Sequence, residues 1–315
     1  MGKRKKSKLQ EHLEYAAAYL IISTVRRAPA AIVKIISNFL GDLLFFVSKK
    51  RRNIAIENLR HAFVNDKSEK EIRTLARNCC RTFFDNFLET IKLNYLFSKP
   101  DTMNMMKEKT ANLNETFKKA RKIHDESGGC IFVTPHLGSW EMTPRVAASS
   151  GIPLVVIVRP LDNKRLEQLI FANRSSSGQV IISKKNALSS LRRALRDGNS
   201  VGILPDQSTM KGLMINFFGR TATTTPLPAL LSIGYNRPIV VISVCRGKEE
   251  FQYECFVSDP IMPGKYTDKK TEIIRLTEEM TREMESIIRK YPEQYLWMHN
   301  RWKTYKGKKA IFSLI

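Results

Sequence analysis

The sequence predicts an α/β protein with a mainly parallel central sheet flanked by helices, preceded by an N-terminal helical, membrane-associated segment. Between residues 130 and 244, short apolar runs rich in β-branched residues alternate with segments of helical periodicity. Strands separated by helices of this length form parallel sheets that are covered on both faces. Two apolar runs with basic flanks open the chain and predict the membrane-associated segment.

Residues 1–52 are expected to anchor the chain to a membrane. Five basic residues within the first ten precede apolar runs at 15–25 and 28–47. No small-residue cleavage site follows the first run, which disfavours a secretory signal. The first run is shorter than the about 20 residues that span a bilayer, and polar residues recur along the second. Amphipathic helices in the membrane interface are therefore expected, with a spanning helix or a buried helical hairpin as alternatives. Basic residues at 49–52 favour the cytoplasmic face.

Residues 53–315 are expected to form the main domain, with a helical lead-in at 53–127, an α/β core at 128–260 and a C-terminal helical part at 261–315. Apolar residues recur every fourth position along 54–97, which predicts a helix. The expected strands are 130–134, 154–158, 180–183, 201–204 and 239–244, with an edge strand at 253–257. The expected helices of the core and its flanks are 113–126, 140–149, 163–174, 187–196, 226–235 and 272–290. The threonines at 221–224 are expected to begin a helix.

Composition limits the classes of partner. The 315 residues are 43% hydrophobic, enough for a substantial core, and carry a formal net charge of +23. Such a charge favours an anionic partner: nucleic acid, anionic lipid or an acidic protein. The five cysteines are scattered without paired metal spacing, which favours a reducing compartment and disfavours a metal site.

His136 is the main candidate for chemistry. The apolar run at 130–134 stops at Pro135, so His136 lies in the turn at the carboxyl end of a strand, where ligands bind in open α/β sheets. Glu141 is expected in the first turn of the next helix, from which it can reach the imidazole. A histidine polarised by a carboxylate suits a general base. A His and a Glu five residues apart also occur by chance, mostly as surface or structural residues.

Polar residues follow two further strands of the predicted sheet. Arg159 closes the second strand, and Asp206 and Gln207 follow the fourth. Taken alone, each of these residue types is common in the turn after a strand and does not indicate a site. Phe217 and Phe218 suit either an acyl chain or a buried core.

Six ordered motifs resemble one family. They read TPHLGSWE at 134–141, VRPLDN at 158–163, NRSSSG at 173–178, LPDQS at 204–208, FFGRTATT at 217–224 and YLWMHNRWK at 295–303. Together they resemble the bacterial lipid A biosynthesis acyltransferases, the lauroyl/myristoyl transferase family of the glycerolipid acyltransferase group with an H-x4-D/E motif. The resemblance covers residues 50 to 305.

The resemblance implies transfer of a fatty acyl group from an acyl thioester, normally on acyl carrier protein, to a hydroxyl of a phosphorylated glycolipid such as a lipid A precursor. The thioester is a co-substrate, and no cofactor is implied. His136 would be the general base and Glu141 would orient it, Arg159 would bind phosphate or developing charge, and Asp206 and Gln207 would shape the acceptor site. The implied location is the cytoplasmic face of the cell inner membrane, where a basic protein meets an acidic carrier protein and an anionic leaflet.

Alternatives remain beside this interpretation. Mycobacterial phosphatidylinositol mannoside acyltransferases look similar, so a coenzyme A thioester and another glycolipid are possible substrates. A thioester hydrolase is the main rival among enzymes. A non-enzymatic basic protein that binds membranes or nucleic acid is the remaining class, although the chain has no zinc-finger spacing, RNP1-like strand or clear recognition helix. Acyl length and acceptor position stay open.

Overall fold

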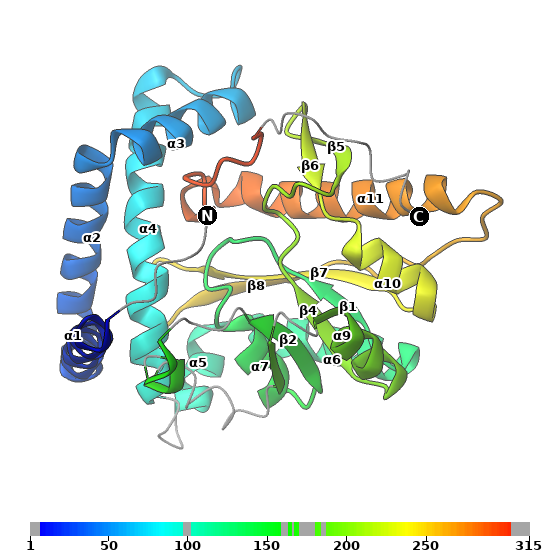
Figure 1. Cartoon of the computed structure of the whole chain (residues 1–315), viewed down its shortest axis with the longest axis horizontal. Helices are drawn as coiled ribbons and strands as arrows, with labels where there is room; N and C mark the ends of the chain where they lie inside the picture. The colour runs from blue at the N-terminus through cyan, green and yellow to red at the C-terminus, as the bar shows by residue number, and fades with distance from the viewer. Residues whose placement is uncertain are drawn as a thin grey trace.

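The central sheet of the computed structural model has six strands, five of them parallel (Figure 1). The structure describes residues 7–96, 102–158, 163–165, 167–169, 180–183 and 187–303. The strand order is β3-β2-β4-β1-β7-β8, and only the β7–β8 pair is antiparallel. These strands are β1 (Ile131–Val133), β2 (Leu154–Val158), β3 (Val180–Ser183), β4 (Ser200–Ile203), β7 (Ile239–Arg246) and β8 (Tyr253–Val257). The predicted α/β class with a mainly parallel sheet is therefore confirmed.

Helices cover both faces of the sheet, as the unbroken apolar strands require. On β1, Ile131 and Val133 pack into one core cluster and Phe132 packs into another. The first cluster contains side chains of α9 (Ala187–Arg196), α10 (Leu227–Tyr235) and α11 (Lys269–Lys290). The second contains side chains of α6 (Leu113–Ser127) and α7 (Thr143–Ser149). The sheet is thus buried on both sides, and functional groups gather at its carboxyl edge.

A two-stranded hairpin, β5 (Leu213–Phe217) and β6 (Arg220–Thr224), contradicts the expected helix start at the threonines. Its turn consists of Phe218 and Gly219, both with positive φ, which is typical of a tight hairpin turn. Phe218 tolerates φ 53° because its amide donates to Glu285 Oε2 at 2.7 Å and its ring packs edge-on against Trp297. Turn geometry and ring packing at this position outweigh the capping preference of threonine.

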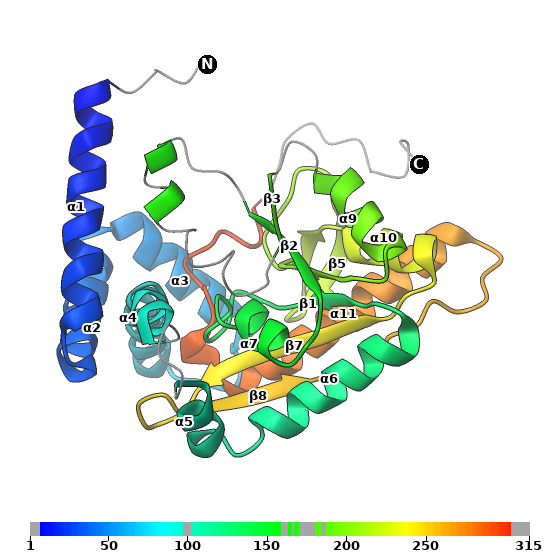
Figure 2. The same cartoon turned by 90° about the horizontal axis from the view of Figure 1, so that it is seen from below.

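The N-terminal half consists of helices that pack beside the sheet. They are α1 (Lys8–Arg27), α2 (Ala30–Val47), α3 (Lys49–Ala62), α4 (Glu69–Leu96) and α5 (Thr102–Lys109). The single helix expected at 54–97 is broken, because Ser68 and Glu71 form a reciprocal cap that starts α4. Figures 1 and 2 both show α4 between the sheet and α1–α2, with α2 alongside α4.

α2 buries only one of its faces. Val33, Ser37, Gly41 and Phe45 are buried at a spacing of four residues. Gly41 allows the close approach, since a Cβ there would lie 2.4 Å from the Cα of Arg81 on α4. In the part of the chain that the structure describes, α2 is the one helix apolar and long enough to cross a membrane, and 22% of that span is buried. Apart from the face that packs on α4, α2 is therefore mostly outside the core of the described structure.

Candidate active site

His136 lies in a tightly held turn at the carboxyl end of β1. The Thr134 amide donates to the carbonyl of Ile203 at 3.1 Å, which keeps β1 beside β4 to its end. Beyond His136, Gly138 has φ +59°, and a Cβ there would lie 2.3 Å from the carbonyl oxygen of Val244. Only glycine fits this close approach without strain. The turn is therefore pressed against β7, and His136 has little freedom to move.

Asp206 holds His136 with two hydrogen bonds. β4 neighbours β1, so the residues that follow the two strands meet at one edge of the sheet. Asp206 Oδ1 lies 2.7 Å from His136 Nδ1, and Asp206 Oδ2 accepts from the His136 backbone amide at 2.9 Å. Asp206 is only 2% exposed. One buried carboxylate thus fixes both the main chain and the ring of His136.

Gln207 contacts the other ring nitrogen. Its Nε2 lies 3.2 Å from His136 Nε2, on the exposed side of the turn. An ionised carboxylate only accepts hydrogen bonds, so in the neutral imidazole Nδ1 carries the proton toward Asp206. The lone pair of Nε2 then faces Gln207 and the exposed side. This tautomer is the one that a general base requires.

The electrostatics of His136 and Asp206 favour a protonated imidazole beside an ionised carboxylate. Burial disfavours the protonated ring, but the charge and hydrogen bond of Asp206 outweigh it, with help from Glu141, and raise the pKa of His136 above its ordinary value. Burial also disfavours ionised Asp206, yet the interactions with His136 and the charge of Arg301 lower its pKa. Asp206 therefore stays ionised and stabilises an imidazolium beside it.

Glu141 does not occupy the position expected from the sequence. It lies in the turn before α7, which begins at Thr143, and its side chain is exposed. Its negative charge contributes to the raised pKa of His136. The hydrogen-bonded orienting contact that we expected from Glu141 is made by Asp206, which corrects the geometry predicted from the H-x4-E spacing.

Comparison with known proteins decides the family. The model of bacterial lipid A biosynthesis acyltransferases matches residues 3–304. The chain belongs to this family. Its relatives include the lipid A biosynthesis palmitoleoyltransferase of Escherichia coli K12, which is 27% identical over 259 residues, or 81% of this chain and 80% of the relative. The lipid A biosynthesis lauroyltransferase of the same organism is 23% identical over 270 residues, covering 84% and 83% of the two chains.

A lipid A biosynthesis acyltransferase of Haemophilus influenzae is 26% identical over 190 residues, or 59% of each chain. Membership of the family makes this chain an acyltransferase enzyme, and the resemblance stated from six motifs is confirmed.

Several residues around the site were not singled out in the sequence. His299 Nε2 accepts from the Ser208 amide at 3.2 Å, and burial lowers the pKa of this second histidine. The Trp140 ring packs edge-on against His136 with centroids 5.3 Å apart. Burial, with the nearby charge of Asp206, raises the pKa of the Tyr295 hydroxyl. Tyr295 and His299 both belong to the YLWMHNRWK motif, which was the available signal.

The remaining expectations divide into structural and undescribed residues. Phe217 and Phe218 are buried in the core, and so is Arg301, which donates to Thr223 O at 2.7 Å and to Thr224 Oγ1 at 2.6 Å. These two phenylalanines therefore belong to the fold and do not form an open acyl surface. Arg159 lies outside the described residues, as does the NRSSSG motif.

Proposed function

We propose that this enzyme transfers a fatty acyl group from an acyl thioester, carried by acyl carrier protein, to a hydroxyl of a phosphorylated lipid A precursor. The observation that carries the proposal is the geometry of His136, whose Nδ1 is held by buried Asp206 while Nε2 faces the exposed side. The names of the relatives support lipid A as the acceptor class.

In the proposed reaction, the acceptor hydroxyl takes the place of Gln207 at His136 Nε2. Nε2 removes the hydroxyl proton while the oxygen attacks the thioester carbonyl, and the C–S bond then breaks. The imidazolium returns the proton to the leaving thiolate, which gives an ester and a free thiol. Asp206 stabilises the imidazolium throughout, and no acyl-enzyme is needed. A base positioned in this way contributes about 10²–10⁴-fold in rate.

Three further residues have proposed roles in this reaction. Gln207, released from Nε2, is suited to bind the acceptor as a hydrogen-bond donor. Arg159 is proposed to bind a substrate phosphate or the developing negative charge, for which a planar guanidinium is suited. Glu141 keeps a proposed electrostatic role, since its charge favours the imidazolium.

The net charge and the N-terminal helices support action at an anionic membrane surface. α1 and α2 carry more than half of the exposed large hydrophobic side chains among the described residues. On α2 they form one stripe: Ile32, Ile35, Phe39, Leu43, Phe46 and Val47. This stripe faces away from α4 and suits insertion into the interface, which would bring the site to an insoluble acceptor at the inner leaflet.

An interfacial α2 fits its contacts better than a spanning α2. Asp42 accepts bidentate hydrogen bonds from Arg77 and Arg81 of α4, all at 2.6–2.7 Å, and Lys34 pairs with Asp85. A spanning α2 would draw these charged groups into hydrocarbon at a cost of several kcal/mol. We therefore infer that α2 lies along the membrane plane, and that residues 1–52 anchor the acyltransferase domain without crossing the bilayer.

The test is product analysis with purified enzyme in detergent. The lipid A precursor is incubated with acyl carrier protein thioesters of defined chain length, and the masses of the lipid products are measured by mass spectrometry. We expect a product heavier by one acyl group. A donor preference for coenzyme A thioesters would overturn the proposed donor, and release of free fatty acid without acylated lipid would indicate a thioester hydrolase.

A further inference from the structure

The turn that carries His136 donates main-chain hydrogen bonds to two segments that are distant in the sequence. The Ser139 amide donates to the carbonyl of Val244 on β7 at 2.7 Å. The Gly138 amide donates to the carbonyl of Gln294 at 3.2 Å, within the short 3-10 helix η2 (Pro292–Gln294) that follows α11. The position of His136 therefore depends on how β7 and η2 are held relative to each other.

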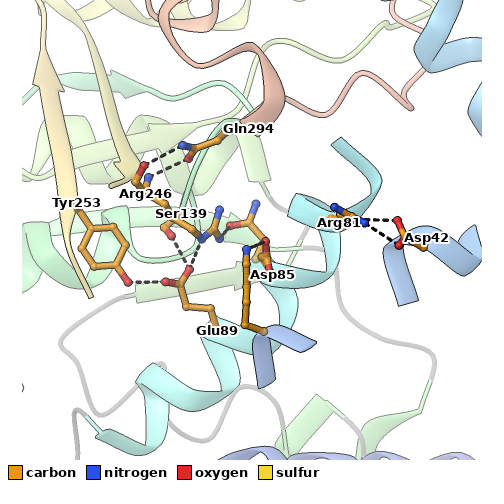
Figure 3. Close-up of polar contacts among 10 residues, drawn as sticks. Asp42, Arg81, Asp85, Glu89, Ser139, Arg246, Tyr253 and Gln294 are labelled. Carbon is orange, nitrogen blue, oxygen red and sulfur yellow. Dashed lines mark hydrogen bonds and ion pairs between the residues drawn. The ribbon is translucent and has the colours of Figure 1, made fainter. Parts of the chain in front are cut away.

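Glu89 of α4 joins the His136 turn to β7 and β8 through one carboxylate (Figure 3). Its Oε2 accepts from Ser139 Oγ at 2.8 Å and from Arg246 Nε of β7 at 2.6 Å. Its Oε1 accepts from Tyr253 Oη of β8 at 2.6 Å. The Ser139 side chain lies within this network and is 2% exposed, so the hydroxyl has a fixed partner.

Arg246 extends the connection to η2. Its backbone amide donates to Gln294 Oε1 at 2.9 Å, and Gln294 Nε2 donates to the Arg246 carbonyl, also at 2.9 Å. The Gln294 carbonyl in turn accepts from Gly138. Figure 3 shows the links of Glu89 to Ser139 and Arg246 and of Arg246 to Gln294. With the Gly138–Gln294 hydrogen bond, they close a ring from Glu89 through Arg246, Gln294 and Gly138 to Ser139 and back.

The ring suits an ionised carboxylate at position 89. Arg246 can only donate, and the hydroxyls of Ser139 and Tyr253 donate to the same carboxylate, so one charged group satisfies all three partners. A neutral amide keeps the shape but loses the charge that binds Arg246, and its NH2 group cannot accept. Burial, followed by the charge of Glu89, raises the pKa of Tyr253 well above its ordinary value, so its hydroxyl stays a donor. Apolar side chains would fill the space without the desolvation cost of this partly buried ion pair, but they would not fix the directions of the three partner groups. What the carboxylate adds is the fixed placement of three segments.

We propose that Glu89 is a positioning residue of the active site, which holds the His136 turn through Ser139 so that the ring and the backbone amide of His136 keep their hydrogen bonds to Asp206. The inference rests on the proposed function and deepens it. Glu89 does not contact His136. It acts through the position of the turn, since a displacement of a catalytic group by about 1 Å can lower the rate by about 10²-fold.

The first test is Glu89→Gln in the acyl transfer assay. We expect kcat to fall roughly 10- to 100-fold while KM for the donor stays within about twofold, because binding groups are untouched. The acid limb of the pH–rate profile should move to lower pH. The groups that face His136 are Asp206, Gln207, Glu141 and His299. The contact that loosens is the one to Asp206. Because Asp206 raises the pKa of His136, a looser contact lowers that pKa. A folded variant with wild-type kcat and pH profile would overturn the proposal.

The second test asks whether Glu89 acts through Ser139. Ser139→Ala removes only a hydroxyl and should lower kcat and shift the acid limb in the same direction. The kcat of the double variant should be no lower than that of Glu89→Gln alone, because both changes break the same Ser139–Glu89 hydrogen bond. Multiplicative losses, or a wild-type profile for Ser139→Ala, would contradict the inference. Ser139→Ala also keeps the inference testable if Glu89→Gln fails to fold.

Glu69→Gln is the matched control. Glu69 is the first residue of the same helix, α4, where it pairs with Arg60 and Arg73 and contacts no member of the ring. Its kcat in detergent should stay within about twofold of wild type. An NMR titration of His136, assigned by comparison with His136→Ala, reads the ring pKa without any activity. If wild type transfers no acyl group but Glu89→Gln still lowers that pKa, the proposed function fails and the positioning role stands.

Discussion

At the scale of single residues, the site consists of an imidazole whose two nitrogens have unlike surroundings. Asp206 is buried at the carboxyl end of β4 and faces Nδ1, whereas Nε2 faces Gln207 on the exposed side. The unlike surroundings fix the tautomer and the direction of proton transfer. A carboxylate that also binds the His136 amide adds a second constraint, because the ring cannot turn without breaking a main-chain contact.

Asp206→Asn should lower kcat about 10²–10⁴-fold. The NH2 group of the asparagine must face one of the two N–H groups that Asp206 binds. If it faces the ring, the ring proton moves to Nε2. If it faces the backbone amide, that hydrogen bond is lost and the turn loosens. The wild-type rate should rise with pH through the raised pKa of His136, because only the neutral ring accepts a proton. Without the Asp206 charge this limb should move to lower pH. A pH–rate profile of both proteins measures the shift, and an unmoved limb would contradict the assigned pair.

The sequence predicted His136, Asp206 and Gln207 as site residues but not the hydrogen bonds between them. Glu141 was chosen as partner because it is near in sequence. Asp206 meets His136 only because β4 inserts between β2 and β1, and strand order does not follow from the spacing of apolar runs. His299 was missed for a similar reason, since the segment after η2 folds back over the strand ends through the Leu137–Tyr295 bridge.

At the scale of elements, α2 has one face for α4 and another for the surroundings. The i, i+4 spacing of Val33, Ser37, Gly41 and Phe45 packs it on α4, and the exposed apolar stripe lies on the other side. Asp42 is bound by two arginines of α4, so the helix is tied to the catalytic domain rather than hinged from it.

Replacing Ile35 and Phe39 together by glutamate should weaken binding to anionic phospholipid vesicles by about tenfold or more, since each apolar side chain contributes about 1.5–3 kcal/mol when buried. Both side chains are about two-thirds exposed, at 66% and 65%, so the free energy of unfolding should hardly change. Vesicle co-sedimentation measures the binding. Met214→Glu on β5, at 66% exposed, is the control. Unchanged binding of the double variant would remove this face of α2 from the membrane contact.

At the scale of the whole molecule, local patterns predicted most elements and the fold class. Three expected strands, 154–158, 180–183 and 253–257, match β2, β3 and β8, because β-branched runs between turn residues leave few alternatives. The hairpin β5–β6 was missed because Phe218 takes a left-handed conformation that only its tertiary contacts stabilise. The predicted helix 163–174 is helical at 164–165 and 167–169, Asn163 forms a bend before it, and the other residues lie outside the described part of the chain.

The most direct measurement is the single-turnover rate of acyl transfer by His136→Ala, with acyl carrier protein thioester as donor and lipid A precursor as acceptor. A loss of about 10²–10⁴-fold, with unchanged circular dichroism and vesicle binding, is the predicted result. Transfer at a near wild-type rate by the folded variant would contradict the assignment of His136 as the base.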